Sequence, residues 1–297
     1  TVLFPVAIRN HMVGGEFILT TSNFGMNFYI GNNAEAEGTY APLRWGRGDW
    51  SFEYHDVVDL AQRAEGRTLT ASEVSRHWTR RALADIASDP WRWVKLLVKK
   101  WLLTWNAVEI SDSESIYAHG DRSIVLKILG GLMHYGILVP LVAVGLWAGW
   151  PRRQTLWPVY LMLIGYALSI TMIFVFARYR HPLTAIMLPF AAAGILYVAS
   201  AVRNRQFKTV LASGLVLAAV AALVNVEIVS KDNVVATTYY NLASTLDLKG
   251  ERDQAVQFYR LALDHNPAHA MAMNNLAIVL YKSGQAEEAK DLLRQAH

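Results

Sequence analysis

The chain has 297 residues, of which 53% are hydrophobic and 18% are charged, and its formal net charge is +4. A soluble domain carries about 25% charged residues. The excess apolar residues form long runs, which excludes a single soluble globule. The absence of cysteine excludes a disulfide framework, a thiolate metal site and a cysteine nucleophile. No basic stripe lies on a polar domain, so we expect no nucleic-acid partner.

The first ten residues form an apolar run that ends in Arg9, Asn10 and His11. The run has neither the basic start nor the cleavage site of a signal peptide. We expect residues 1–10 to be the end of a truncated transmembrane helix, and the chain to be an internal piece of a longer protein.

Residues 11–123 are predicted to form one long loop domain. Its first part is rich in Gly and Asn, which favour turns. Thr70 and Glu73 then fit a capping box, which predicts a helix that runs to about Ser88. A second helix is predicted to begin at Asp89 as N-cap, followed by a proline.

The second of these helices has the composition of an interfacial helix. Its aromatic and leucine residues recur every four positions, and cations lie to one side of them. The apolar stripe comprises Trp93, Leu97, Trp101 and Trp105, and the cations are Arg92, Lys95 and Lys99. Such a stripe edged by cations is what a helix at a membrane surface needs.

Residues 124–230 are predicted to contain four transmembrane helices, at about 124–150, 155–177, 182–202 and 210–230. Each is long enough to cross a bilayer core of about 30 Å. The short connections at 151–154 and 203–208 are basic, so we expect them to be cytoplasmic. The long loop, the connection at 178–182 and the C-terminal tail are then extracytoplasmic.

The tail at 231–297 contains a repeat with an offset of 34 residues. Asn-Leu-Ala at 241–243 recurs at 275–277, and the same offset pairs glycines, alanines and leucines further along. This period and pattern are those of tetratricopeptide repeats. We expect about two repeats here, with more after His297, because each helix pair needs neighbours to bury its apolar face. The sequence therefore predicts a mainly α fold: a polytopic helix bundle with a long extracytoplasmic loop and a helical solenoid.

Arg178, Tyr179 and Arg180 are the main candidates for a binding site. They lie between two predicted spans, on the side where cations are disfavoured. They either reach lipid phosphates by snorkelling or form a site for a phosphate, which guanidinium groups bind bidentately. Arg9 is expected at the same membrane level and is a further candidate.

The long loop offers a second, weaker group of candidates. Asn32 and Asn33 follow a glycine and form either a structural turn or part of a site. Asp49, Glu53 and His55 are titratable residues close in sequence, so they are either a solvated loop or a place for acid–base chemistry. Their spacing matches no metal motif. We predict no cofactor, and the sequence leaves divalent-metal dependence open.

Several of these stretches, in their order and spacing over residues 1–230, resemble the C-terminal half of a known family. The stretches are residues 4–10, 15–19, 23–33, 72–78, Asp89-Pro90 and the Arg-Tyr-Arg-His-Pro run at 178–182. They are similar to bacterial polytopic glycosyltransferases of the C superfold, in the group of dolichyl-phosphate-mannose-protein mannosyltransferases and aminoarabinose transferases. His181 departs from the pattern, where the family often has leucine.

The resemblance implies a glycosyltransferase of the bacterial inner membrane. Its donor would be a polyprenyl-phosphate-linked sugar, its surroundings membrane lipid, and its acceptor an extracytoplasmic lipid, glycan or protein. The family's catalytic aspartate would lie upstream of Thr1, so no catalytic residue is assigned in this chain. Arg178 and Arg180 would hold the donor phosphate, and the repeats would bind a protein partner.

Two other functions fit the same pattern. An enzyme of the O-antigen ligase or polymerase type is also polytopic and would use a lipid-pyrophosphate donor. Alternatively, the chain is a membrane anchor that has no catalytic activity and presents repeats for protein–protein interaction.

Overall fold

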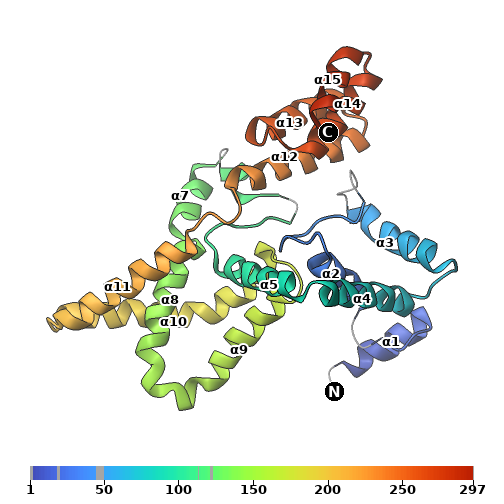
Figure 1. Cartoon of the computed structure of the whole chain (residues 1–297). Helices are drawn as coiled ribbons and strands as arrows, with labels where there is room; N and C mark the ends of the chain where they lie inside the picture. The colour runs from blue at the N-terminus through green and yellow to red at the C-terminus, as the bar shows by residue number, and fades with distance from the viewer. Residues whose placement is uncertain (1–2, 19–20, 45–49, 113, 121–122, 297) are drawn as a thin grey trace. The chain divides into compact units, whose positions relative to one another are not determined.

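The computed structural model describes residues 3–18, 21–44, 50–112, 114–120 and 123–296, and within these ranges it contains helices but no strand (Figure 1). The predicted mainly α class is confirmed. The chain divides into two compact units: Thr1–Lys99 with Met172–Phe174, and Lys100–Thr171 with Val175–His297. We call them unit 1 and unit 2 and describe each by itself.

Unit 1 comprises four helices and most of a fifth. They are α1 (Phe4–Gly14), α2 (Phe24–Asn32), α3 (Trp50–Glu65), α4 (Ala71–Ser88) and α5 (Pro90–Trp105), whose last residues belong to unit 2. The predicted capping box begins α4: the Glu73 N–H donates to Thr70 Oγ1 at 3.4 Å, and the Thr70 N–H donates to the Glu73 carboxylate at 2.9 Å. A hydrogen bond from Arg67 is the main reason that the pKa of Glu73 falls to about 2.

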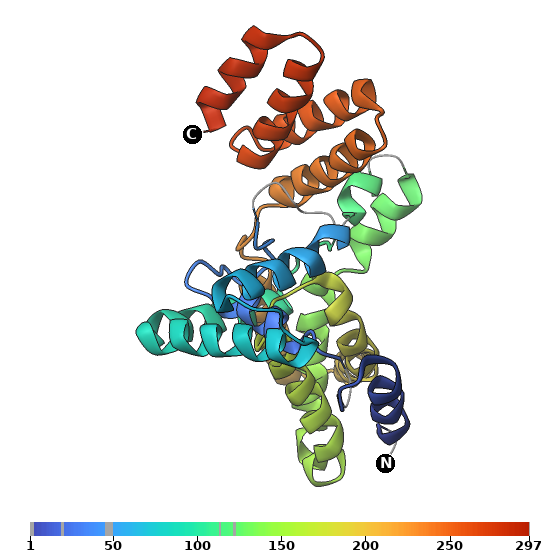
Figure 2. The same ribbon diagram turned by 90° about the vertical axis from the view of Figure 1, so that its right-hand side faces the viewer.

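The core of unit 1 lies around α4. Trp78 of α4 is buried, and its indole N–H donates to the Val57 carbonyl of α3 at 3.1 Å. The ring of Tyr29 in α2 lies 4.7 Å from the Trp78 ring. Figure 2 shows α2, α3 and α4 together from a second side. These contacts fix α2, which ends at the candidate residue Asn32, against α4.

The apolar part of unit 2 is built from five helices and a 3₁₀ turn. They are α7 (Ile124–Leu132), α8 (Tyr135–Gly149), η1 (Trp150–Arg152), α9 (Arg153–Thr171), α10 (Ala177–Arg203) and α11 (Phe207–Val224). Among the residues that the structure describes, three helical stretches are long and apolar enough to cross a membrane: Ile124–Thr171, Ala177–Arg203 and Phe207–Val224. The sequence pattern predicted four spans over the same region, at about 124–150, 155–177, 182–202 and 210–230.

Helix ends differ from the predicted spans where polar side chains bind the backbone. The expected span at 124–150 is broken, because His134 caps α8 by accepting the Gly136 N–H at 3.1 Å. The expected span at 210–230 ends at Val224, where the Asn225 side chain donates to the Ala221 carbonyl at 2.8 Å.

Two of the apolar helices, α8 and α10, pack closely. A Cβ built on Gly145 of α8 would lie 1.8 Å from the carbonyl oxygen of Phe190 in α10. Only glycine permits this approach of the two backbones. The packing also sets the start of α10, which carries the predicted arginines, beside the start of α8.

The C-terminal helices form two antiparallel pairs. They are α12 (Lys231–Leu248) with α13 (Arg252–His265), and α14 (Ala270–Lys282) with α15 (Ala286–Ala296). Gly250 and Gly284, which are 34 residues apart, both follow the first helix of a pair with φ values of 83° and 85°. Ala243 and Ala277 are equivalent buried positions of one apolar core. The predicted repeat is thus present in the backbone and in the packing.

A short helix from the long loop, α6 (Ile116–Gly120), packs against the repeats. The Ser115 N–H donates to Thr238 Oγ1 of α12 at 2.9 Å, and both residues are buried. Ala118 joins the core of the repeats, and the Lys231 ammonium lies 5.4 Å from the centre of the Tyr117 ring. The first helix of the repeats is therefore covered by loop residues of unit 2.

Candidate functional site

The two predicted phosphate-binding arginines, at the start of α10, have different surroundings. The Arg180 side chain is 1% exposed, pairs with Glu109 at 2.8 Å, and lies 4.1 Å from the centre of the Tyr135 ring. Its guanidinium also donates to the carbonyls of Leu103, Asn106 and Val108 at 3.0, 2.7 and 3.3 Å. A guanidinium offers five N–H donors in a rigid fork. Arg180 uses these donors to hold the backbone of the neighbouring segment that contains Leu103 and Val108.

The segment that Arg180 holds, residues 103–110, is also fixed by backbone bonds. The Ala107 N–H donates to the Val224 carbonyl at 2.8 Å, and the Ala177 N–H donates to the Ile110 carbonyl at 2.7 Å. The Asn106 side chain donates to the Val224 carbonyl at 3.0 Å. The end of the long helix α5 is thereby attached to the start of α10 and the end of α11.

A cavity of about 700 Å³ lies beside this segment. Its size falls within the range of ligand pockets, about 300–1,000 Å³. Loop residues, α6, α8 and α10 contribute most of its lining. Polar lining residues are Glu109, Ser111, Asp112, Glu114, Tyr117, His134, Tyr135, Arg178, His181 and Thr184, and apolar ones are Ile116, Met133, Leu138, Ala185 and Leu188.

The cavity-lining face of α10 changes from charged to apolar along the helix. Arg178 and His181 are followed by Thr184, and then by Ala185 and Leu188. Leu188 lies ten positions after Arg178, which is about 15 Å at the rise of an α-helix. A ligand that lies along this face meets cationic and polar groups at one end and hydrocarbon at the other. This arrangement suits an amphiphile.

All three carboxylates of the cavity have ionic partners. Glu109 pairs with Arg180, Asp112 pairs with Arg178, and Glu114 lies 2.8 Å from His119 Nε2. The Tyr117 hydroxyl accepts the Glu109 N–H at 2.9 Å, and burial raises the pKa of this tyrosine.

Sequence reasoning missed these acidic residues and His134. Three carboxylates within the six residues 109–114, directly after the Trp-rich helix, were the available signal. Their convergence on α10 depends on the folded segment described above.

Of the other predicted residues of this cluster, Arg178 lines the cavity and Tyr179 lies beside it in sequence. The Arg178 side chain is 59% exposed, and its guanidinium carbon lies 5.1 Å from the centre of the Tyr179 ring. Tyr179 is half-buried, with its ring 5.9 Å from that of Phe176. Arg9 is exposed on α1, and therefore belongs to unit 1.

Asn32 and Asn33 at the end of α2 bind neighbouring backbone. The buried Asn32 amide donates to the Phe28 and Met172 carbonyls at 2.8 and 2.9 Å, and its oxygen accepts the Trp93 indole N–H at 2.9 Å. Asn33 donates to the Tyr29 carbonyl at 3.1 Å. The expected turn is thus wrong for Asn32, which is the last residue of helix α2, and Asn33 follows as the C-cap. Both side chains bind backbone carbonyls at this helix end.

The remaining loop candidates lie on or before α3. Asp49 is outside the described residues. Glu53 is half-buried and His55 is exposed, with its ring 6.3 Å from that of Tyr54. Asp56 is buried and pairs with Arg44 at 2.7 Å. Within the described ranges, no three His, Asp or Glu residues group in a way that could hold a metal ion.

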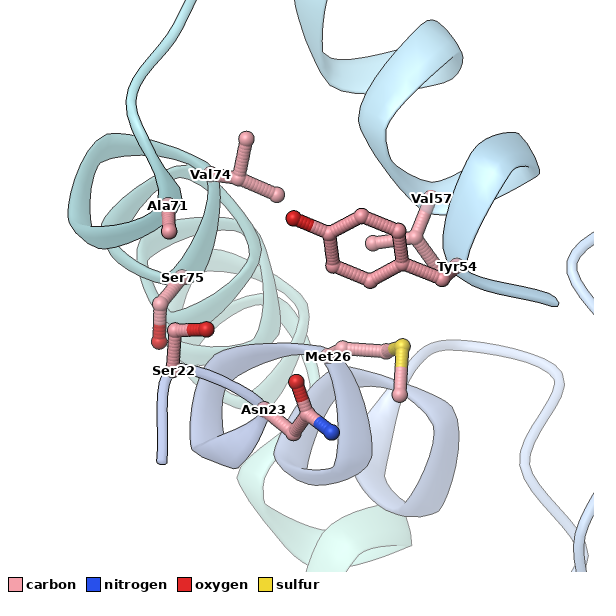
Figure 3. Close-up of a pocket in the computed structure, with 8 residues that line it drawn as sticks. All are labelled: Ser22, Asn23, Met26, Tyr54, Val57, Ala71, Val74 and Ser75. Carbon is pink, nitrogen blue, oxygen red and sulfur yellow. The ribbon is translucent and has the colours of Figure 1, made fainter. Parts of the chain in front are cut away.

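A second pocket lies in unit 1 between α2, α3 and α4 (Figure 3). The figure shows the Tyr54 ring directed into it, with Val74 on one side and Met26 on the other. Its volume is about 10 Å³, which is the space of one water molecule. The pocket is therefore too small for a sugar or a lipid headgroup.

Comparison with known proteins identifies only the C-terminal part of the chain. A model of the tetratricopeptide repeat matches residues 248–296. Tetratricopeptide repeat protein 8 of Mus musculus is 43% identical over 61 residues, which are 20% of this chain and 12% of that protein. The photosystem I assembly protein Ycf3 of Cyanophora paradoxa is 39% identical over 56 residues, which are 18% of this chain and 32% of that protein.

The chain thus spans a third or less of the length of these relatives. No solved structure matches it significantly. The two helix pairs α12–α15, their 34-residue offset and the matching family model agree with one another. The chain is a helical protein that contains tetratricopeptide repeats.

Proposed function

We propose that the chain is part of an integral membrane glycosyltransferase that moves a sugar from a polyprenyl-phosphate donor to an extracytoplasmic acceptor. The observation that carries this proposal is the change from charged to apolar along the cavity-lining face of α10. A polyprenyl-phosphate sugar is an amphiphile with one anionic phosphate and a long hydrocarbon chain. This face of α10 offers Arg178 to the phosphate and aliphatic side chains to the hydrocarbon, while the three carboxylates of the lining are paired with arginine or histidine side chains.

The phosphate is assigned to the polar end of this face. Arg178 remains partly exposed at the cavity, whereas the Arg180 guanidinium is buried and donates to three backbone carbonyls. Arg178 is thus the arginine that can turn to a ligand, and His181 lies one helical turn further on. A guanidinium stabilises the charge on a departing phosphate, especially where water is scarce. Arg180 then acts as a positioning residue.

The proposal includes a bacterial inner-membrane location, with α8–α11 as the main membrane-embedded helices. The basic connections at 151–154 and 203–208 orient the cavity and the repeats to the extracytoplasmic side. A lipid donor would then reach Leu138, Ala185 and Leu188 from the bilayer, and an acceptor would reach the charged end from outside.

Binding of polyprenyl phosphate to the full-length protein in nanodiscs tests this proposal. Arg178→Ala is expected to weaken binding about tenfold or more, because a hydrogen bond to a charged group contributes about 1.5–3 kcal/mol. Arg152→Ala removes an exposed cation outside the cavity lining and is the matched control, expected to bind like the unmodified protein.

Equal affinities of the Arg178→Ala and Arg152→Ala proteins would contradict the phosphate site. A sugar-transfer assay with paired donors separates the related alternatives. Turnover of a monophosphate donor supports the proposed reaction, whereas turnover of a pyrophosphate donor alone would indicate an enzyme of the O-antigen ligase or polymerase type.

A second candidate function is protein binding through the repeats. It is favoured by the family match and by exposed apolar side chains on α14, where Ile278 and Tyr281 are 43% and 69% exposed. Stacked repeats commonly form extended concave binding surfaces. If the chain is an anchor without catalytic activity, Tyr281→Ser abolishes partner recruitment, and the Arg178→Ala protein retains full function in cells.

A further inference from the structure

The first part of α5 has an exposed apolar face in unit 1. Trp91, Val94 and Val98 are 67%, 40% and 54% exposed, respectively. They follow one another at spacings of three and four, so they lie on one side of the helix. Lys95 lies on the same side, and its ammonium is 5.8 Å from the centre of the Trp91 ring.

The opposite side of the helix is attached to unit 1. The Arg92 guanidinium donates to the Asn33 and Ala36 carbonyls, both at 3.1 Å, and Leu96 is buried. The Trp93 indole binds Asn32, so this tryptophan faces the protein. The expected stripe beginning at Trp93 is therefore half-buried, and the outward face begins at Trp91 instead.

The charge of this helix matches an anionic surface. Residues 90–105 contain four basic residues and no carboxylate. Arg92 binds carbonyls of unit 1 and Lys100 is buried. The exposed cation of the outward face is therefore Lys95, and Lys99 lies 3.7 Å from Glu37. A tryptophan paired with lysine beside aliphatic side chains suits the headgroup region of a bilayer, where the indole is partly immersed and the ammonium stays near phosphates.

We propose that this face, defined by Trp91, Val94, Lys95 and Val98, lies in the headgroup region of a bilayer that contains anionic lipid. The inference rests on the membrane insertion of α8–α11 in the proposed function. Because α5 runs from unit 1 into unit 2, unit 1 is covalently tethered to those helices. The face would then help to hold unit 1 at the membrane.

Site-directed spin labelling tests this placement, because the chain contains no cysteine to remove. The full-length protein is placed in nanodiscs with anionic lipid and labelled at Val98→Cys. Ala84→Cys, exposed on α4, serves as the aqueous reference, and Leu215→Cys, 63% exposed on α11, serves as the lipid reference. Accessibility to oxygen and to a water-soluble nickel reagent is measured at each site.

The expected ratio of oxygen accessibility to nickel accessibility at Val98 lies between the ratios at the two reference sites. When anionic lipid is replaced by zwitterionic lipid, the ratio at Val98 is expected to move toward that of the aqueous reference. An aqueous value at Val98 beside a lipid value at Leu215 would overturn this inference and leave the proposed function intact. An aqueous value at Leu215 would overturn membrane insertion itself. Exclusion of both reagents at Val98 would indicate a protein cover and also overturn the inference.

Discussion

Arg178 and Arg180 are two residues apart, yet one lines a cavity and the other is enclosed. The cause is helical spacing: a step of two residues turns a side chain to the other side of α10, where the carbonyls of residues 103–108 lie. The same residue type therefore serves a different purpose at each position.

We predict that Arg180→Met destabilises the protein by about 3–5 kcal/mol, because it leaves Glu109 without its buried partner and three carbonyls without donors. Denaturant unfolding in detergent measures the loss. Arg178→Met breaks an exposed ion pair and exposed contacts with Tyr179, and is expected to change stability by less than about 1 kcal/mol. Similar losses for both variants would refute the structural role of Arg180.

Lys100 of α5 makes stability depend on pH. Burial lowers the pKa of Lys100 from 10.5 to about 7, so in this interval the unfolded chain binds a proton that the folded chain releases. The free energy of unfolding therefore rises with pH from about 7 toward 10.5.

We expect Lys100→Met to reduce the rise in the free energy of unfolding between pH 7.5 and 9, because methionine has no group that titrates in this interval. Denaturant curves at the two pH values measure this effect, and Lys95→Met, at an exposed position of the same helix, is the control. A slope that Lys100→Met leaves unchanged would rule out this assignment.

At the scale of helices, glycine contacts set the geometry around the cavity. Gly145→Ala places a methyl group against the Phe190 carbonyl, so α8 and α10 must separate. We predict a clear loss of thermal stability and weaker lipid binding. Gly165→Ala on α9 meets nothing within 4 Å and serves as the control, expected to match the unmodified protein. A melting temperature for Gly145→Ala equal to that of the control would show that the helices do not depend on this contact.

For the whole molecule, α6 links the cavity and the repeats of unit 2. Ile116 and Tyr117 line the cavity, while Ser115 and Ala118 contact the repeats. We predict that Thr238→Val, which leaves the buried Ser115 N–H without an acceptor, costs about 1–3 kcal/mol and increases hydrogen exchange in both α6 and α12. Thr237→Val, on the exposed side of α12, is the control. Faster exchange confined to α12 would disprove this link.

Periodicity and capping were sufficient to predict the repeats and the start of α4, because both signals are local. The break at His134 was not predictable in this way, since a single polar residue in an apolar run is also compatible with one continuous helix. The cavity depends on contacts between residues 70 or more positions apart, such as Arg180 with Leu103 and Val108. Sequence spacing indicated Arg178 and Arg180 equally and could not say which would be enclosed.

The ion pair between Arg178 and Asp112 has a consequence for ligand exchange. An anion that binds Arg178 must displace the Asp112 carboxylate from it. The affinity of the anion therefore depends on how much more negative charge it carries than Asp112. In the proposed reaction the donor is a phosphodiester with one negative charge, whereas the released lipid phosphate is a monoester with a charge of about −1.5 to −2 at pH 7. The spent carrier would therefore compete better than the fresh donor, and its departure would limit turnover.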